Sequence, residues 1–288
     1  MVLINMLMGV IVLNKMLLID LETQNYPVES GIYEAACLVV EDYEVVDQLY
    51  LGKEIEGHIG DKRYGYGFYD ISRDDECLTE FKEFLSKYPY PIVAHNCAFD
   101  KKFLLYYSWV EESYSFYCSM RAIRIEQNSL ASYALHNLVR HYQIADDTDH
   151  KAMSDTINLY KLLKIIQPKT WIPVGTPLQK KSNRSGWGKK IKPRSLDEID
   201  LPIYSTDILA GENVCFTGKS EYPRHTMEEI AIKNGAEISN NVISKTTLLV
   251  VGLDAGSKLD KAQAKEIVII SDKEFMKMLD LAREDVGA

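Results

Sequence analysis

The stretch LLIDLETQN, residues 17–25, ends an apolar run with two carboxylates two positions apart. Side chains alternate between the two faces of a β-strand, so Asp20 and Glu22 are expected on one face near the end of a buried strand. Two like charges this close together are costly unless a positive group lies between them. The stretch therefore predicts a strand that presents a pair of acids to a cation.

Two further polar segments follow along the chain. AHNCAFD places Asp100 after a short apolar strand, and HKAMSD places His150 five residues before Asp155. That spacing does not share one helical face, so we expect His150 on a loop and Asp155 in the first turns of the next helix. Four carboxylates on a sheet and its helices suit Mg²⁺ or Mn²⁺. Shared carboxylates can hold two such ions, and a neutral histidine nearby can take a proton from water.

Each segment also has a plainer structural explanation when it is taken alone. Asp20 and Glu22 could be a solvated strand end, and His150 could be a surface histidine beside the acidic turn ADDTD. Asp100 could simply lie near a helix N-terminus, where negative charge is favoured. The ordered set of three segments is what favours a chemical role.

In that order, LIDLET, AHNCAFD and HKAMSD resemble the three exonuclease motifs of the DEDDh group, whose members have the ribonuclease H-like fold. The group includes the proofreading epsilon subunit of bacterial replicative DNA polymerase. The resemblance covers about residues 16–166 and implies 3′→5′ exonuclease chemistry that releases nucleoside 5′-monophosphates. It implies that two divalent ions, Mg²⁺ or Mn²⁺, are held by Asp20, Glu22, Asp100 and Asp155, with His150 as the general base. It also implies that three residues lie near the substrate strand or support the site: Thr23, His95 and Asn96.

Two segments depart from the family pattern or stand outside it. The family usually continues its first acids with Thr-Thr-Gly, whereas Gln24 and Asn25 follow Thr23 here, so the substrate preference is less defined than the chemistry. Residues 57–72 are unusually aromatic. Their rings could stack on bases or form a half-buried loop. These aromatic residues are Tyr64, Tyr66, Phe68 and Tyr69.

The pattern of apolar residues predicts an α/β fold for residues 16–167, with a mixed sheet and flanking helices. Strands are expected over residues 15–22, 32–41, 44–52 and 91–96, and helices over residues 76–88, 98–109, 129–144 and 154–166. The last of these helices is expected to bury one face, which comprises Met153, Ile157, Tyr160, Leu163 and Ile166.

Residues 168–207 are predicted to be a basic linker that contains proline and glycine. The first part, residues 168–196, has many basic residues and no acidic one. It could be a solvated tether, or it could attract a phosphate backbone, with Trp171 or Trp187 available to stack on a base.

Residues 208–288 alternate strand and helix patterns, which predicts a small parallel sheet flanked by helices. VCFTGK, SKTTLLVVG, GSKLDKAQ and the segment IIS followed by DKEFMKML resemble a BRCT module, with Phe275 in place of the more common tryptophan. Such modules often bind a phosphate, as on a DNA 5′ end. The resemblance implies four residues for this role: Thr217, Gly218, Arg224 and Lys261. A module that serves only for packing or protein contacts is the alternative.

Composition limits the remaining possibilities. Five scattered cysteines without a CxxC pair indicate reduced thiols in a cytoplasmic protein. Residues 1–15 are an apolar leader, which we interpret as an extra strand or a disordered leader that could be non-native, rather than as a membrane anchor, because Asn5, Asn14 and Lys15 interrupt it. A net charge of −9 alone would disfavour nucleic acid, but the basic linker concentrates positive charge.

The leading hypothesis is a DNA 3′→5′ exonuclease that its BRCT module delivers to DNA ends, or to a polymerase or repair-complex partner. An exonuclease acting on RNA or short oligonucleotides is an alternative with the same chemistry. An inactive, nuclease-derived DNA-binding or scaffold protein is the alternative of another class.

Overall fold

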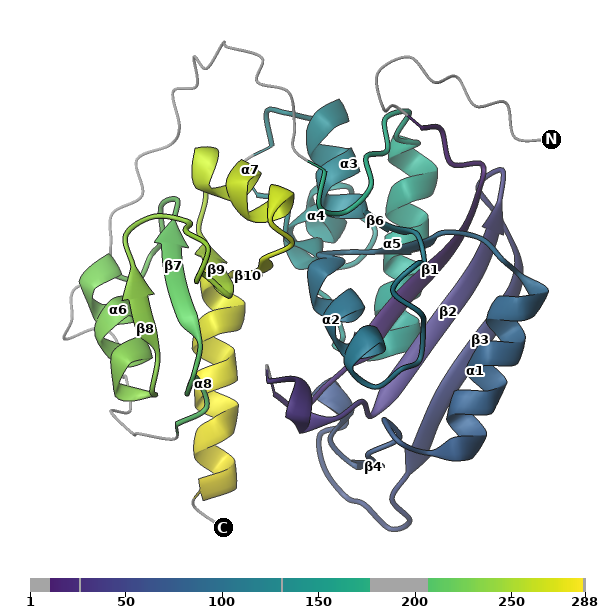
Figure 1. Cartoon of the computed structure of the whole chain (residues 1–288), viewed down its shortest axis with the longest axis horizontal. Helices are drawn as coiled ribbons and strands as arrows, with labels where there is room; N and C mark the ends of the chain where they lie inside the picture. Colours follow the sequence, from purple (N-terminus) through teal and green to yellow (C-terminus); the bar gives the residue numbers. More distant parts are fainter. Residues whose placement is uncertain (1–10, 26, 131, 177–206, 287–288) are drawn as a thin grey trace. The chain divides into compact units, whose positions relative to one another are not determined.

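The computed structural model describes residues 11–25, 27–130, 132–176 and 207–286 (Figure 1). They separate into two compact units, the first formed mainly by residues up to Val174 and the second mainly by residues from Gly175 onward. Both units combine helices with a sheet, so the predicted α/β class is confirmed. Most of the predicted leader and linker, residues 1–10 and 177–206, lies outside the described residues.

The first unit is built on a six-stranded mixed sheet with the order β4-β3-β2-β1-β5-β6. Antiparallel pairing joins β1 to β2, β2 to β3 and β3 to β4, whereas β5 and β6 run parallel to β1. Antiparallel strands followed by parallel strands make up the mixed sheet that was predicted. The strands are β1 (Lys15–Glu22), β2 (Glu34–Glu41), β3 (Glu44–Glu54), β4 (Phe68–Tyr69), β5 (Ile92–Ala94) and β6 (Phe116–Cys118).

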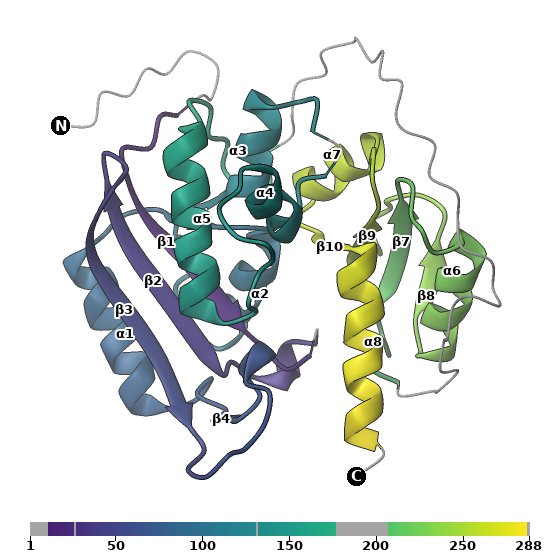
Figure 2. The same ribbon diagram turned by 180° about the vertical axis from the view of Figure 1, so that it is seen from behind.

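Helices cover both faces of this sheet. Figures 1 and 2 show α5 lying along β1 and β2 on one face and α1 on the other. The α-helices are α1 (Asp75–Lys87), α2 (Ala98–Tyr106), α3 (Ser119–Glu126), α4 (Leu135–His141) and α5 (Ala152–Ile166), and two short 3₁₀ turns are η1 (Val28–Ser30) and η2 (Arg63–Gly65). The sequence analysis did not predict β4, β6 or α3.

Alternate side chains of β1 face the hydrophobic core on one side of the sheet and the acidic cluster on the other. Leu17, Ile19 and Leu21 are buried in the main hydrophobic cluster, which also contains Phe81 of α1. Since successive side chains point to opposite faces, Asp20 and Glu22 lie on the face that α5 covers. The strand thus anchors the fold with one face and presents the acids with the other.

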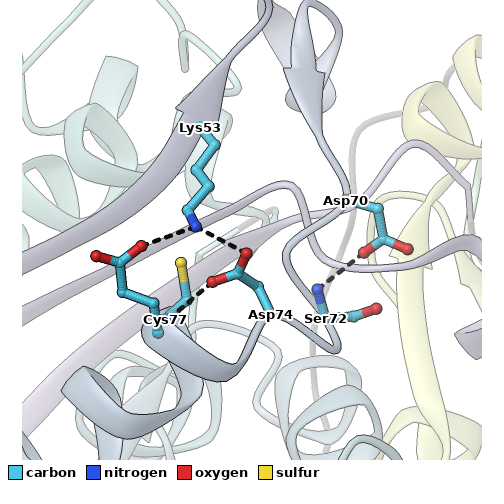
Figure 3. Close-up of polar contacts among 6 residues, drawn as sticks. Lys53, Asp70, Ser72, Asp74 and Cys77 are labelled. Carbon is cyan, nitrogen blue, oxygen red and sulfur yellow. Dashed lines mark hydrogen bonds and ion pairs between the residues drawn. The ribbon is translucent and has the colours of Figure 1, made fainter.

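The N-terminus of α1 is fixed to β3 by a polar cluster (Figure 3). Asp74 caps the helix by accepting a 3.0 Å hydrogen bond from the backbone amide of Cys77. Lys53 of β3 pairs with Asp74 at 2.7 Å and with Glu76 at 3.0 Å. Because a side-chain cap satisfies an otherwise unpaired amide, this contact sets where the helix begins.

The predicted core face of α5 is wrong except for Leu163. The buried side chains are instead those of Ala152, Asp155, Thr156, Asn158, Leu159, Leu162 and Leu163. Met153, Ile157, Tyr160 and Ile166 are only partly buried, and Ile165 is 54% exposed. The helix has apolar residues on several sides, and it is turned so that Asp155 faces the sheet.

The helix predicted over residues 129–144 is shorter than expected and spans only Leu135–His141. The segment before it is used for tertiary hydrogen bonds. The ring Nε2 of His95 lies 2.8 Å from the carbonyl oxygen of Tyr133, and the Tyr133 hydroxyl donates to the carbonyl of Gln127 at 2.6 Å. The carbonyl of Tyr133 is thus engaged by His95, and the amide of Asn137, its partner in a regular α-helix, bonds to the carbonyl of Ala134 instead.

The expectation that Trp171 could stack on a base is wrong. Its side chain is fully buried, and its Nε1 donates to the carbonyl of Pro168 at 3.0 Å. Its backbone pairs with Ile11, and Val174 donates to the carbonyl of Phe116 at 2.9 Å. Residues 168–174 therefore pack on the first unit. Trp187 lies outside the described residues.

The second unit has a four-stranded sheet with the order β10-β9-β7-β8, in which all pairs are parallel, as predicted. Its elements are β7 (Asn213–Thr217), α6 (Arg224–Lys233), β8 (Glu237–Ser239), β9 (Leu248–Val251), α7 (Ser257–Ala264), β10 (Val268–Ser271) and α8 (Asp272–Val286), of which β8 was not predicted. Phe275 is fully buried and packs edge-on against Phe216, with ring centroids 5.4 Å apart. A phenylalanine therefore fills this core position.

Within the described part of the chain, every helix is too short or too polar to cross a lipid bilayer.

Candidate metal centre

Three carboxylates converge where α5 crosses β1. Asp20, Glu22 and Asp155 each offer an oxygen, and these oxygens all lie within 4.8 Å of one another. Two of the three side chains are buried, and the third is partly buried. The cluster joins the first and the last of the sequence motifs, which are more than a hundred residues apart in the chain.

Backbone pairing on both sides fixes the two acids of β1. Asp20 is paired with Ala36 of β2, and Glu22 is paired with Glu34. On the other edge, β1 pairs with β5 as far as Ile19, directly before Asp20. A strand held between two neighbours leaves its side chains little freedom to shift, so the pair is rigidly presented.

Asp155 is held by the chain that precedes it. The backbone amide of Asp149 donates to its Oδ1 at 3.2 Å, and the amide of His150 also hydrogen-bonds to the carboxylate. Ser154 in turn donates to Asp149 at 2.5 Å. The turn before α5 therefore orients the acid, as expected from the loop position predicted for His150.

The electrostatics of the cluster disfavour several negative charges in the absence of a cation. Burial raises the pKa of Asp20 well above its usual range, and the charges of Glu22, Asp155 and Asp100 raise it further. Burial raises the pKa of Asp155 to about 7, against hydrogen bonds from the amides of Asp149 and His150. Repulsion of this kind is relieved when a divalent cation binds.

Asp100 supports the centre from α2. Its side chain is buried in the first turn of that helix, and burial raises its pKa to about 8. Its own amide and that of Leu21 hydrogen-bond to the carboxylate, and its charge raises the pKa of Asp20. It does not belong to the trio within 4.8 Å, but it lies close enough to act on it.

This donor set fits a hard divalent cation. Carboxylate oxygens are the ligands that Mg²⁺ and Mn²⁺ prefer, and among the described residues no cysteine or histidine joins the cluster. Asp20, Glu22 and Asp155 could hold such an ion, and Asp100 could complete the negative charge around a second one.

His150 lies on the loop before α5 with a left-handed backbone (φ 50°). Its ring stacks on the ring of Tyr64, and the backbone amide of Tyr64 donates to its carbonyl oxygen at 2.9 Å. Its Nε2 lies 3.4 Å from the hydroxyl of Thr148. Sequence reasoning had noted Tyr64 as an aromatic residue, but it missed this contact.

The other aromatic residues of residues 57–72 occupy different environments. Phe68 is buried, Tyr66 is half-buried, and Tyr69 is 56% exposed. The half-buried aromatic loop, one of the two predicted alternatives, therefore describes Tyr64 and Tyr66, whereas only Tyr69 is exposed enough to meet a base freely.

The predicted substrate-side residues lie at the carboxyl ends of β1 and β5. Thr23 is buried directly after β1. His95 has its Nδ1 2.9 Å from the hydroxyl of Ser119, and its Nε2 contacts Tyr133. Asn96 has a left-handed backbone (φ 62°) and accepts a hydrogen bond from the amide of Phe99 at 2.9 Å. For His95, these contacts fit the supporting role better than direct contact with a substrate.

In the second unit, the structure brings most of the predicted phosphate-binding residues to the end of β7. The Arg224 guanidinium donates to the carbonyls of Phe216 at 2.8 Å and Gly218 at 3.0 Å. Lys258, which the sequence analysis had not singled out, donates to the same Phe216 carbonyl at 3.1 Å. Lys261 is exposed three residues further along α7, on the same side of that helix.

Comparison with protein families identifies this second unit. Residues 205–279 match the model of the BRCA1 C Terminus (BRCT) domain. They are a BRCT domain. Curated relatives include the DNA ligase of Desulfovibrio desulfuricans, 44% identical over 75 residues (26% of this chain and 10% of the ligase), and that of Methylacidiphilum infernorum, 29% identical over 147 residues (51% and 21%). The chain thus spans about a fifth or less of the length of these ligases.

The first unit resembles solved exonuclease structures. Exonuclease X in complex with 5′ overhanging duplex DNA is 18% identical, with a TM-score of 0.34, 54% of this chain covered and 97% of that one. Exonuclease I from Methylocaldum szegediense is 16% identical (TM-score 0.40; 55% and 42% covered). A 3′-exonuclease that recognises the histone mRNA stem-loop is 14% identical (TM-score 0.40; 56% and 90%). At such values the chemistry has to be argued from this chain's own residues.

Proposed function

We propose that this protein is a metal-dependent 3′→5′ exonuclease that hydrolyses DNA to nucleoside 5′-monophosphates. The observation that carries the proposal is the cluster of Asp20, Glu22 and Asp155 within 4.8 Å, with His150 on the loop that orients Asp155. Two divalent cations bound there would activate water and stabilise the negative charge that develops on the phosphodiester.

The chain's own residues contribute binding, orientation and proton transfer. Asp20, Glu22, Asp100 and Asp155 would hold the cations, and the buried strand and helices would keep the four acids in place. His150 accepts the proton of the attacking water as the general base, since a histidine pKa lies near neutral pH. The proposal assigns Thr23, Asn96 and the segment with Gln24 and Asn25 to contacts with the terminal nucleotide, and His95 to support of the site.

The BRCT domain adds a second binding function to the proposal. Arg224 and Lys258 bring positive charge to the end of β7, where Thr217 and Gly218 offer a hydroxyl and a backbone amide, and Lys261 is exposed three residues after Lys258 on α7. Such a set suits a phosphate group. We propose that the domain binds a DNA end or a polymerase or repair-complex partner, and thereby directs a proofreading or repair nuclease to its substrate.

The test is a degradation assay with labelled DNA and RNA of matched sequence. We expect 5′-mononucleotides to be released from the 3′ end of DNA with Mg²⁺ or Mn²⁺, and release to stop in Asp20→Ala and Asp155→Ala. Glu41→Ala is the control, because this acid of β2 pairs with Lys15 away from the centre.

Other outcomes of this assay select the alternatives. Faster release from RNA would make the protein an exoribonuclease with the same centre. No release from either polymer with either ion, together with intact DNA binding, would favour the inactive binding or scaffold protein.

A further inference from the structure

A fifth acid, Glu34, lies beside the cluster, and no sequence motif had pointed to it. It begins β2 and is paired directly with Glu22 of β1. Directly paired residues of antiparallel strands point to the same face, with Cβ atoms about 4.5–5.5 Å apart. Glu34 is therefore on the α5-covered face, next to Glu22 and diagonal to Asp20.

The environment of Glu34 is unusual for a carboxylate. The residue is only 3% exposed, and its Oε1 accepts a 2.8 Å hydrogen bond from the hydroxyl of Tyr50. Its Oε2 is buried and has no hydrogen-bond partner among the described residues. A buried acid with an unused oxygen is costly, so such an oxygen calls for a ligand.

The charges around Glu34 do not supply that ligand. Lys151 and Lys62 favour its charged form, but burial has the largest effect and leaves its pKa raised. Within the described residues, neither lysine forms an ion pair with it; Lys62 pairs with Glu54 instead. The charge of Glu34 also raises the pKa of Asp20.

We propose that Glu34, oriented by Tyr50, is an additional cation-binding carboxylate of the centre formed by Asp20, Glu22 and Asp155. The inference rests on the proposed function, because it takes the same site to be a divalent cation centre. Tyr50 is the positioning residue: its hydroxyl occupies Oε1 and leaves Oε2 for the cation. A side chain that orients a metal ligand, as Tyr50 would orient Glu34, typically changes metal affinity about 10–100-fold when it is removed.

The test measures Mn²⁺ binding by calorimetry on the metal-stripped full-length chain, without substrate. We expect Glu34→Gln to raise the Kd by about 10-fold or more, and Tyr50→Phe to raise it in the same direction by less. Glu41→Gln, the same substitution on the same strand, should leave the Kd unchanged. Because Tyr50→Phe keeps the carboxylate and the ring, it provides a folded variant if Glu34→Gln is unstable.

Melting temperatures separate this role from a merely structural one. In a chelator, Glu34→Gln should melt no lower than the wild type, because it removes a charge that repels Asp20. A purely structural Glu34 would instead lower the melting temperature in the chelator and leave the Kd unchanged, which would overturn the inference.

Asp20→Asn distinguishes the failure of this inference from the failure of the proposed function. If Asp20→Asn loses Mn²⁺ binding while Glu34→Gln binds within twofold of the wild type, the inference about Glu34 is wrong and the centre stands. If Asp20→Asn also binds like the wild type, the cation centre and the proposed function are wrong as well.

Discussion

The ring of Tyr64 stacks on the ring of His150, with centroids 4.3 Å apart and ring planes at 24°. Both residues have a left-handed backbone, with φ of 58° and 50°, and a backbone hydrogen bond joins them. Such conformations are uncommon for residues other than glycine and persist where surrounding contacts impose them. Two segments remote in sequence thus hold the proposed general base between them.

The first prediction concerns this stack. Tyr64→Leu should lower kcat by about 10-fold or more with little change in KM, because a displaced base slows proton transfer without removing substrate contacts. Tyr64→Phe keeps the ring and should restore the rate. Tyr69→Leu is the matched control, since Tyr69 is exposed in the nearby strand β4. An equal loss in Tyr64→Phe would show that the hydroxyl matters rather than the stack.

The second prediction concerns pH and stability without cations. The folded state binds protons on Asp155 up to about pH 7, whereas an unfolded aspartate releases its proton near pH 4. This acid therefore makes the free energy of unfolding fall as the pH rises from about 4 to 7. We expect Asp155→Asn to raise the free energy of unfolding by about 1 kcal/mol or more at pH 8 in chelator, and by much less at pH 5.

Urea unfolding followed by circular dichroism measures this difference. Comparing the variant with the wild type at each pH cancels the other titrating groups. Added Mn²⁺ should stabilise the wild type at pH 8 and leave Asp155→Asn almost unchanged. A variant that is equally destabilised at both pH values would mean that the acid serves only as a hydrogen-bond acceptor.

The third prediction concerns Trp171. Because this side chain is fully buried, Trp171→Ala should destabilise the protein by about 3–5 kcal/mol. Trp171→Phe should cost less, since it loses the hydrogen bond to Pro168 but keeps most of the volume. Tyr106→Ala, at an exposed aromatic position, is the control. Weakened binding of single-stranded DNA by Trp171→Phe at unchanged stability would contradict the buried role.

The fourth prediction concerns the BRCT domain. Lys261 is exposed, so Lys261→Ala should leave the melting temperature unchanged and weaken the binding of 5′-phosphorylated duplex DNA several-fold. Fluorescence anisotropy in chelator, at a single salt concentration, compares this DNA with a 5′-hydroxyl duplex. Lys245→Ala, which removes another exposed lysine, is the control. Equal affinity for the two duplexes in the wild type would exclude phosphate recognition.

The sequence indicated the strands and acids of the site because their signals are local. Asp20 and Glu22 follow an unbroken apolar run, and a strand's alternation directly gives their shared face. The buried face of α5 was harder to predict, because apolar residues occur on several sides of this helix. Only its packing against β1 and β2 determines that Asp155 faces the sheet. Helix periodicity alone therefore suggested the wrong face.

Contacts between distant segments were beyond the reach of pattern analysis. The Tyr64–His150 stack depends on where a long irregular loop returns to the sheet. The position of Glu34, in contrast, could have been predicted. Pairing residues 15–22 with residues 34–41 as antiparallel strands places an acid directly opposite Glu22. Trp171 was assigned to a linker because its neighbours are proline, glycine and lysine, although its own size favours burial.

Because β1 lies between β2 and β5, the same register of this strand is needed to form the hydrophobic core and to assemble the acidic cluster. If the strand slipped by one residue, Leu17, Ile19 and Leu21 would leave the hydrophobic cluster, and Asp20 and Glu22 would enter it. A chain in that register could neither form its core nor assemble the carboxylates. Only correctly paired molecules would therefore bring these acids together with Asp155, so a misfolded population would lack the proposed cation centre.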